Sequence, residues 1–158
     1  QYERLMISVE RTRLMFERIL VLCYGNICRS PAAEFMLRQR LPERFIIDSA
    51  GVGALVGRGA DETVTQLLHA RDIDVSAHEA KQVTRTMLSR FDLVLVMEQE
   101  HLEAVTKIAP EARGKTKLLG CWIGNKEIPD PYKKTYEIYE LADSMIAQAV
   151  DSWMNYLG

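Results

Sequence analysis

The chain has 158 residues, about the length of one domain. Its composition of 47% hydrophobic and 27% charged residues is that of a globular protein and excludes a disordered or low-complexity scaffold. The net charge of -2 argues against binding nucleic acid through bulk charge, and no apolar stretch approaches the roughly 20 residues of a membrane span. Three cysteines, Cys23, Cys28 and Cys121, are too few for a disulfide framework and favour a reducing cytoplasm.

The first 14 residues are expected to be an N-terminal extension or an expression remnant. They mix acidic and basic side chains and lack the apolar core of a signal peptide. A short helix with Leu5, Met6 and Val9 on one face is the alternative interpretation. The folded domain is therefore predicted to span residues 15–158.

Short apolar runs alternate with segments of helical periodicity along the rest of the chain. We expect strands at residues 19–23, 45–50, 91–97 and 115–119, and helices at residues 30–41, 61–70, 84–89, 98–108 and 137–156. Ser30 before Pro31 indicates one helix start, and Asp61 another. The pattern predicts a single α/β domain whose four-stranded parallel sheet carries helices on both faces. Ligands bind such folds beyond the carboxyl ends of the strands.

The first predicted strand ends in the sequence CYGNICRSP, which joins it to a helix. A strand, a short loop and a helix start bring backbone N–H groups and the positive helix end to one place, which favours an anion. The segment lacks the GxxxxGK[ST] pattern of a nucleotide-binding P-loop. It instead places Cys23 and Arg29 with five residues between them. We therefore predict a phosphate-binding loop after the first strand.

Cys23 and Arg29 together predict phosphoryl transfer. The loop stabilises a thiolate at Cys23, and the Arg29 guanidinium offers two donors to a tetrahedral oxyanion. Attack by the thiolate on phosphorus would give a cysteinyl-phosphate. Such a reaction needs a proton donor, and Asp130 between two prolines is the best candidate. No cluster of metal ligands stands out, so neither a metal nor another cofactor is expected.

The segment CYGNICRSP with a distant DPY resembles the low-molecular-weight protein tyrosine phosphatase family. The resemblance extends from about Phe16 to Leu157. The segments DSAGVGALVGRGAD, SAHEAKQ, APEARGK and EIPDPYKK resemble the bacterial branch that is associated with capsule and exopolysaccharide export.

The resemblance implies a role for each loop residue. Cys23 corresponds to the nucleophile, Arg29 to the phosphate clamp and Asp130 to the general acid and base. Ser30 corresponds to the hydroxyl that hydrogen-bonds the thiolate, and Asn26 to a residue in a left-handed turn. The remaining phosphate-binding positions are Tyr24, Gly25, Ile27 and Cys28.

The resemblance also implies residues around the loop. Ser49 and His78 correspond to the partners that hold Asn26, and Cys28 is expected to form a reversible disulfide with Cys23 under oxidant. The expected substrate walls are Tyr132, beside the acid, and a variable loop near Leu55 and Val56. His69 and His101 have no motif context and are expected on the surface.

Three other functions remain as hypotheses. Arsenate reduction needs a relay of cysteines, and residues 78–90 contain none. A protein-arginine phosphatase carries, by resemblance, Thr at the position of Ile27. A phosphotyrosine-binding module would not need both Cys23 and Asp130. The sequence thus favours a cytoplasmic phosphotyrosine phosphatase whose partner, by resemblance, is a bacterial tyrosine autokinase, with no nucleic-acid partner and no membrane insertion.

Overall fold

The computed structural model describes residues 16–157, so the predicted extension at residues 1–14 lies outside the described residues. Its centre is a four-stranded sheet with the order β2-β1-β3-β4, and every strand pair is parallel. The strands are β1 (Arg18–Cys23), β2 (Ile46–Gly51), β3 (Leu93–Val96) and β4 (Thr116–Leu118). The predicted α/β class and the four-stranded parallel sheet are confirmed.

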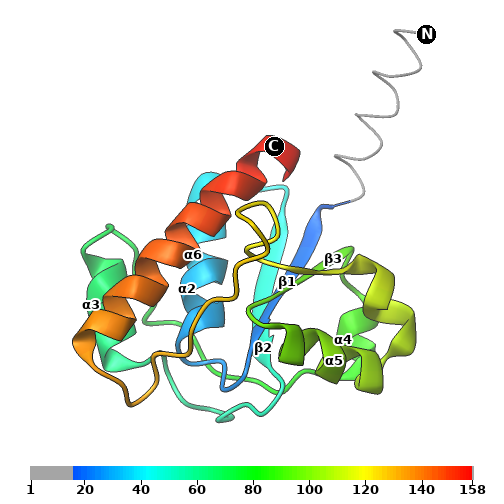
Figure 1. The fold of residues 1–158 in the computed structure, drawn as a ribbon, viewed down its shortest axis with the longest axis horizontal. Coiled ribbons are helices and arrows are strands. Elements are labelled where there is room, and N and C mark those ends of the chain that lie inside the picture. Colours follow the sequence, from blue (N-terminus) through cyan, green and yellow to red (C-terminus); the bar gives the residue numbers. More distant parts are fainter. Residues whose placement is uncertain (1–15, 158) are drawn as a thin grey trace, which may run out of the picture.

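Helices lie on both sides of the sheet (Figure 1). One side carries α2 (Arg29–Arg40), α3 (Glu62–His69) and α6 (Tyr136–Leu157), and the other carries α4 (Arg85–Ser89) and α5 (Gln99–Ile108). A 3₁₀ helix, η1 (Pro110–Lys115), follows α5 and was not predicted. The other elements begin and end within two residues of their predicted bounds.

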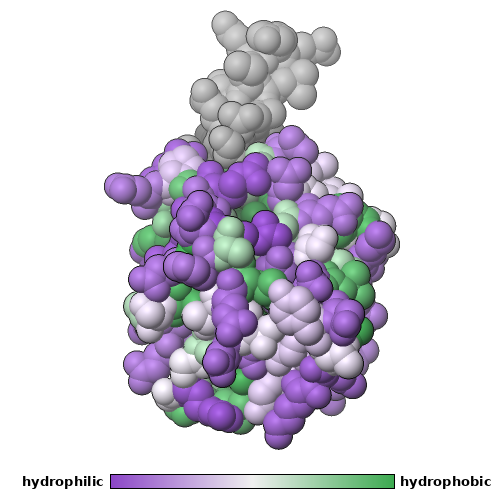
Figure 2. All heavy atoms as spheres, turned by 90° about the vertical axis from the view of Figure 1, so that its left-hand side faces the viewer, coloured by the Kyte–Doolittle hydropathy of each residue, from purple (hydrophilic) through white to green (hydrophobic). Residues whose placement is uncertain are grey.

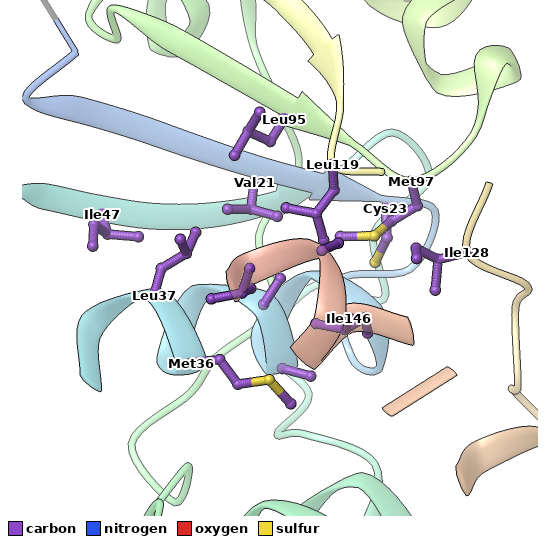
Figure 3. Close-up of a cluster of buried hydrophobic side chains, with 14 of the residues drawn as sticks. Val21, Cys23, Met36, Leu37, Ile47, Leu95, Met97, Leu119, Ile128 and Ile146 are labelled. Atoms are coloured by element: carbon purple, nitrogen blue, oxygen red, sulfur yellow. The ribbon is translucent and has the colours of Figure 1, made fainter. Parts of the chain in front are cut away.

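The two sides of the sheet form two hydrophobic clusters that share β1. Ile19 and Val21 pack into the cluster under α2 and α6, whereas Leu20 and Leu22 pack into the cluster under α4 and α5. All four side chains are fully buried, which explains the continuous apolar run of a central parallel strand. Figure 3 shows Cys23 at one end of the first cluster, on the side of Met97 and Ile128. The packed core therefore fixes the strand end that carries Cys23.

The start of α2 differs from its prediction. Cys28 stands at the N-cap without a side-chain hydrogen bond, and the predicted cap, Ser30, lies inside the first turn. The Ser30 hydroxyl is instead 2.9 Å from Cys23 Sγ. Because this hydroxyl faces the thiol, it does not cap the helix. The first N–H groups of α2 thus remain directed at the loop without a side-chain cap.

Polar side chains predominate on the face that carries α3 and α6, with apolar side chains scattered among them (Figure 2). Within residues 16–157, no helix is both long and apolar enough to cross a membrane.

Asp61 caps α3 as predicted, and its loss should destabilise the fold. Its Oδ1 accepts the N–H groups of Thr63 and Val64 at 2.9 and 3.2 Å, and its Oδ2 accepts the Tyr139 hydroxyl at 3.0 Å. We expect Asp61→Ala to lower the free energy of unfolding by about 1–2 kcal/mol, as measured by urea denaturation. Asp61→Asn keeps an oxygen that can cap the helix, so its free energy of unfolding should fall much less. Equal losses in the two variants would contradict the capping account.

Candidate active site

Cys23 ends β1 at the carboxyl edge of the sheet, and the loop of residues 23–29 carries the chain from β1 into α2. The carbonyl groups of this loop point outward. The carbonyl oxygens of Cys23, Tyr24, Gly25 and Ile27 accept hydrogen bonds of 2.8–3.0 Å from the backbone N–H groups of residues 52, 53, 55 and 61. Since a peptide C=O and N–H point in opposite directions, the N–H groups of the loop face inward. Among residues 16–157, the N–H groups of residues 24–28 meet no acceptor, so they form a cradle for an anion.

Close packing against the segment after β2 supports this outward orientation. Gly51 pairs with Cys23 across the sheet, and a Cβ atom at position 51 would collide with the carbonyl oxygen of Tyr24. Glycine at this position therefore permits the close approach of the two backbones.

Asn26 holds the middle of the loop in the left-handed conformation that the resemblance implies, with a φ of 60°. His78 Nε2 donates to the Asn26 carbonyl at 2.6 Å, and the Lys81 N–H donates to Asn26 Oδ1 at 2.9 Å. Asn26 Nδ2 donates to the hydroxyls of Ser30 and Ser49 at 2.8 and 3.0 Å. All polar groups of the side chain are thus used, and they fix a conformation that costs free energy in isolation.

Arg29 is 2% exposed, and hydrogen bonds from one of its terminal nitrogens fix its guanidinium. Its Nη1 donates to Glu98 Oε2 and to the Ile128 carbonyl, both at 2.8 Å. Its Nε is buried and has no hydrogen-bond partner among the described residues. Its Nη2 lies 3.6 Å from Asp130 Oδ2. A buried donor without a partner is costly, so the free edge of Arg29 matches a bound oxyanion.

Asp130 lies across the pocket from the loop. Its Oδ1 accepts the N–H group of Tyr132 at 3.1 Å, and prolines precede and follow it. About 45% of its side chain is exposed, so water can reach the carboxyl. Asp130 and Arg29 therefore flank the same space from different elements.

The pocket is open to solvent and, with its mouth, holds about 420 Å³ of empty space. It is lined by Cys23, Tyr24, Gly25, Ile27, Cys28, Arg29, Leu55, Asp130 and Tyr132. Most of the predicted site residues therefore meet here. Val56 does not line the pocket, and 68% of it is exposed.

Glu98 was not predicted as a site residue, and His101 is not on the surface as expected. Glu98 precedes α5 and pairs with Arg29. His101, expected on the surface, is 2% exposed: its Nδ1 accepts the Glu98 N–H at 3.2 Å, and its Nε2 lies 3.5 Å from Glu98 Oε2. Burial, followed by the nearby Arg29 charge, lowers the pKa of His101 to about 4, so its ring is neutral at pH 7. A Glu at a helix start with His three residues later was the available signal.

Comparison with known proteins places the chain in a family. Residues 18–158 match the family model described as low molecular weight phosphotyrosine protein phosphatase. The probable low molecular weight protein-tyrosine-phosphatase AmsI of Erwinia amylovora is 45% identical over 143 residues, which cover 90% of this chain and 99% of AmsI. A solved structure of Vibrio vulnificus Wzb in complex with benzylphosphonate has a TM-score of 0.87 at 44% identity, covering 90% of this chain and 99% of Wzb. The chain belongs to the low molecular weight protein tyrosine phosphatase family.

One structural neighbour is named for a different substrate. The YwlE arginine phosphatase from Geobacillus stearothermophilus has a TM-score of 0.81 and covers 88% of this chain and 91% of its own, at 30% identity. It is thus more distant in sequence than AmsI and Wzb.

The buried His101 should make the protein sensitive to acid. Since its pKa falls from 6.5 to about 4 on folding, the unfolded chain takes up a proton first as the pH falls. The full free energy of unfolding is therefore present above pH 6.5. As the pH falls from 6.5 to 4, it decreases by about 3 kcal/mol in all. Urea unfolding at a series of pH values should show a smaller loss for His101→Asn than for wild type. The same pH dependence in wild type and His101→Asn would contradict this prediction. The matched control is His69→Asn, which changes an exposed histidine and should unfold like wild type at every pH.

Proposed function

We propose that this protein is a protein-tyrosine phosphatase that transfers the phosphoryl group of phosphotyrosine first to Cys23 and then to water. One observation carries the proposal: the Nε of Arg29, which has no partner among the described residues, and the inward N–H groups of the loop lie around one pocket, next to Cys23. These donors match the oxygens of a phosphoryl group throughout its transfer.

In the first step, the Cys23 thiolate attacks phosphorus and forms the S–P bond while the bond from phosphorus to the tyrosine oxygen breaks. Asp130, as the carboxylic acid, gives its proton to the departing oxygen. Arg29 and the loop N–H groups bind the three non-bridging oxygens. The products are a cysteinyl-phosphate, the substrate's tyrosine side chain with its hydroxyl restored, and the Asp130 carboxylate.

In the second step, the Asp130 carboxylate takes a proton from a water molecule, and the water oxygen attacks phosphorus. The S–P bond breaks and the thiolate of Cys23 leaves with its electron pair. The Ser30 hydroxyl, 2.9 Å from Cys23 Sγ, donates a hydrogen bond that stabilises this leaving group. Orthophosphate departs, and Asp130 is again protonated for the next cycle.

The shape of the pocket supports an aromatic phosphate as the substrate. Cys23 lies at its base, 2% exposed, and Tyr24, Leu55 and Tyr132 form walls above it. An aryl ring bridges the distance between the base and the rim and packs against these walls. The side chain of phosphoserine is shorter and leaves the walls without contact. We therefore propose phosphotyrosine, with Tyr24, Leu55 and Tyr132 as the residues that bind its ring.

The biological setting is carried over from the resemblance to the capsule- and exopolysaccharide-associated branch. It supports a tyrosine autokinase of polysaccharide export as the partner that this phosphatase opposes. The cysteines Cys23, Cys28 and Cys121 are all free, which fits the reducing cytoplasm as the site of action.

Phosphate release from matched phosphotyrosine, phosphoserine and phosphoarginine substrates, in the presence of EDTA, tests the proposal. We expect turnover of the phosphotyrosine peptide alone. Cys23→Ser should abolish it because the hydroxyl is a poor nucleophile at neutral pH. Asp130→Ala should lower kcat by about 10²–10⁴-fold because the leaving oxygen then departs without a proton.

Each alternative outcome has a definite meaning. Preference for phosphoarginine would overturn the substrate class and leave the Cys23 chemistry in place. Binding of phosphotyrosine by wild type without turnover would identify a binding module instead. Arsenate reduction by a folded protein that releases no phosphate would contradict the proposal entirely.

We also propose that Cys28 protects Cys23 against oxidation. Both thiols line the same pocket, and Cys28 is 4% exposed. Burial, with the nearby Asp61 charge as the next cause, raises the pKa of the Cys28 thiol, so it stays protonated and Cys23 meets peroxide first. Peroxide oxidises Cys23 to the sulfenic acid, which then condenses with Cys28 to a disulfide and releases water.

The Cys28→Ser variant tests this protection. After brief exposure to hydrogen peroxide, wild type should regain its activity in dithiothreitol, and Cys28→Ser should regain less. Equal recovery of the two proteins would rule out the disulfide. Cys121→Ser, which changes a thiol outside the pocket, should behave like wild type.

A further inference from the structure

We propose that Gly53 determines how tightly the pocket binds an aryl group, because its lack of a side chain leaves the space in which the Tyr24 ring lies. The inference rests on the proposed function, in which Tyr24 is one wall of the pocket. Gly53 itself does not line the pocket. It is therefore a positioning residue that acts through Tyr24.

The hydroxyl end of the Tyr24 ring lies against the backbone of Gly53. A Cβ atom on Gly53 would come within 2.6 Å of Tyr24 Cζ, 2.8 Å of its Cε2 and 2.9 Å of its hydroxyl oxygen. The Gly53 N–H also donates to the Tyr24 carbonyl at 2.9 Å, so the ring turns back over the residue that binds its own backbone. Although 59% of Tyr24 is exposed, its ring thus occupies the space that a side chain at position 53 would fill.

The backbone conformation of Gly53 does not require glycine. The glycines with a positive φ among residues 16–157 are Gly57 and Gly124. Gly53 therefore lies outside the left-handed region that favours glycine, and alanine can adopt its φ. The contact that excludes a Cβ atom at position 53 is the one with Tyr24, so the ring explains the glycine.

The backbone on both sides of Gly53 is fixed and cannot move back to admit a side chain. Gln82 Nε2 donates to the Val52 carbonyl at 3.0 Å, and Gln82 Oε1 accepts the Ala54 N–H at 2.9 Å. The amide of Gln82 thus binds both neighbours of Gly53, much as the backbone of a paired strand would. A Cβ atom at position 53 would therefore displace the Tyr24 ring and leave the backbone in place.

The position of the Tyr24 ring decides which contacts a substrate ring can make. Tyr24 lines the pocket together with Leu55 and Tyr132. Displacing its ring changes this wall, whereas the hydrogen bond from the Gly53 N–H still holds the Tyr24 carbonyl and with it the inward N–H groups of the loop. The affinity for an aryl group should therefore fall while the affinity for the phosphoryl group is retained.

Gly53→Ala tests the inference because it adds the one Cβ atom that the ring excludes. Isothermal titration calorimetry compares two ligands that are not hydrolysed: phosphonomethylphenylalanine, which carries an aryl group, and methylphosphonate, which does not. We expect the Kd of phosphonomethylphenylalanine to rise about 3–10-fold, as for the loss of one aromatic contact. The Kd of methylphosphonate should change less than about 2-fold.

Two further variants separate the ring from a general effect of the added methyl group. Gly59→Ala adds a Cβ atom in the same segment, where the nearest atom is the His78 carbonyl oxygen at 3.9 Å, and should bind both ligands like wild type. In a Tyr24→Ala background, Gly53→Ala should change neither Kd because the ring that it displaces is absent.

The contact between Tyr24 and Gly53 can also be measured without a ligand. In NMR spectra of wild type, the α-proton resonances of Gly53 should carry a ring-current shift that is lost in Tyr24→Ala. This measurement needs neither turnover nor a folded Gly53→Ala variant.

Four results would overturn the inference. They are an unchanged Kd of phosphonomethylphenylalanine in Gly53→Ala, equal losses for both ligands, the same loss in the Tyr24→Ala background, and no ring-current shift at Gly53. None of these measurements depends on turnover, and hydrolysis of a phosphotyrosine peptide by wild type is measured separately. Failure of the proposed function and failure of this inference are thus distinguishable.

Discussion

The outward orientation of the carbonyl groups in the loop of residues 23–29 is the constraint on which the rest of the site depends. Hydrogen bonds from residues 52–61 hold these carbonyls, and the N–H groups consequently face the space beside Cys23. N–H groups without acceptors raise the free energy of the folded protein when the pocket is empty. They lower the free energy of the complex when an oxyanion is bound. Under the proposed function, phosphate binding offsets the free energy that this loop costs on folding, so the loop is preorganised for phosphoryl transfer.

Supports from several elements keep this loop and its neighbours in place. Asn26 receives hydrogen bonds from His78 and Lys81, and Arg29 is fixed by Glu98 from the start of α5. The neutral His101 in turn binds the backbone of Glu98. Buried polar networks of this kind are stable only when every donor meets an acceptor, so the loss of one member affects groups two or three bonds away. The geometry of the pocket thus depends on hydrogen bonds from α5, from the segment that contains His78 and from Lys81.

The sequence predicted what depends on local chemistry. Three local signals were informative: the apolar run of β1, the cap at Asp61 and the residues CYGNICRSP. They were sufficient to predict the fold and a site that contains Cys23, Arg29 and Asp130. Glu98 and His101 were missed or misplaced because their partners lie on other elements and only the folded chain brings them together. Ser30 resembled a helix cap locally, whereas the thiol of Cys23 is its neighbour in space.

Direct detection of the cysteinyl-phosphate tests the central claim most sharply. Rapid acid quenching of wild type during turnover of a phosphotyrosine peptide should trap the intermediate, because the two proposed steps both pass through it. Peptide mapping by mass spectrometry should then find one phosphoryl group on the peptide that contains Cys23. A phosphoryl group on another residue, or turnover by wild type with no phosphoenzyme at any quench time, would contradict the account.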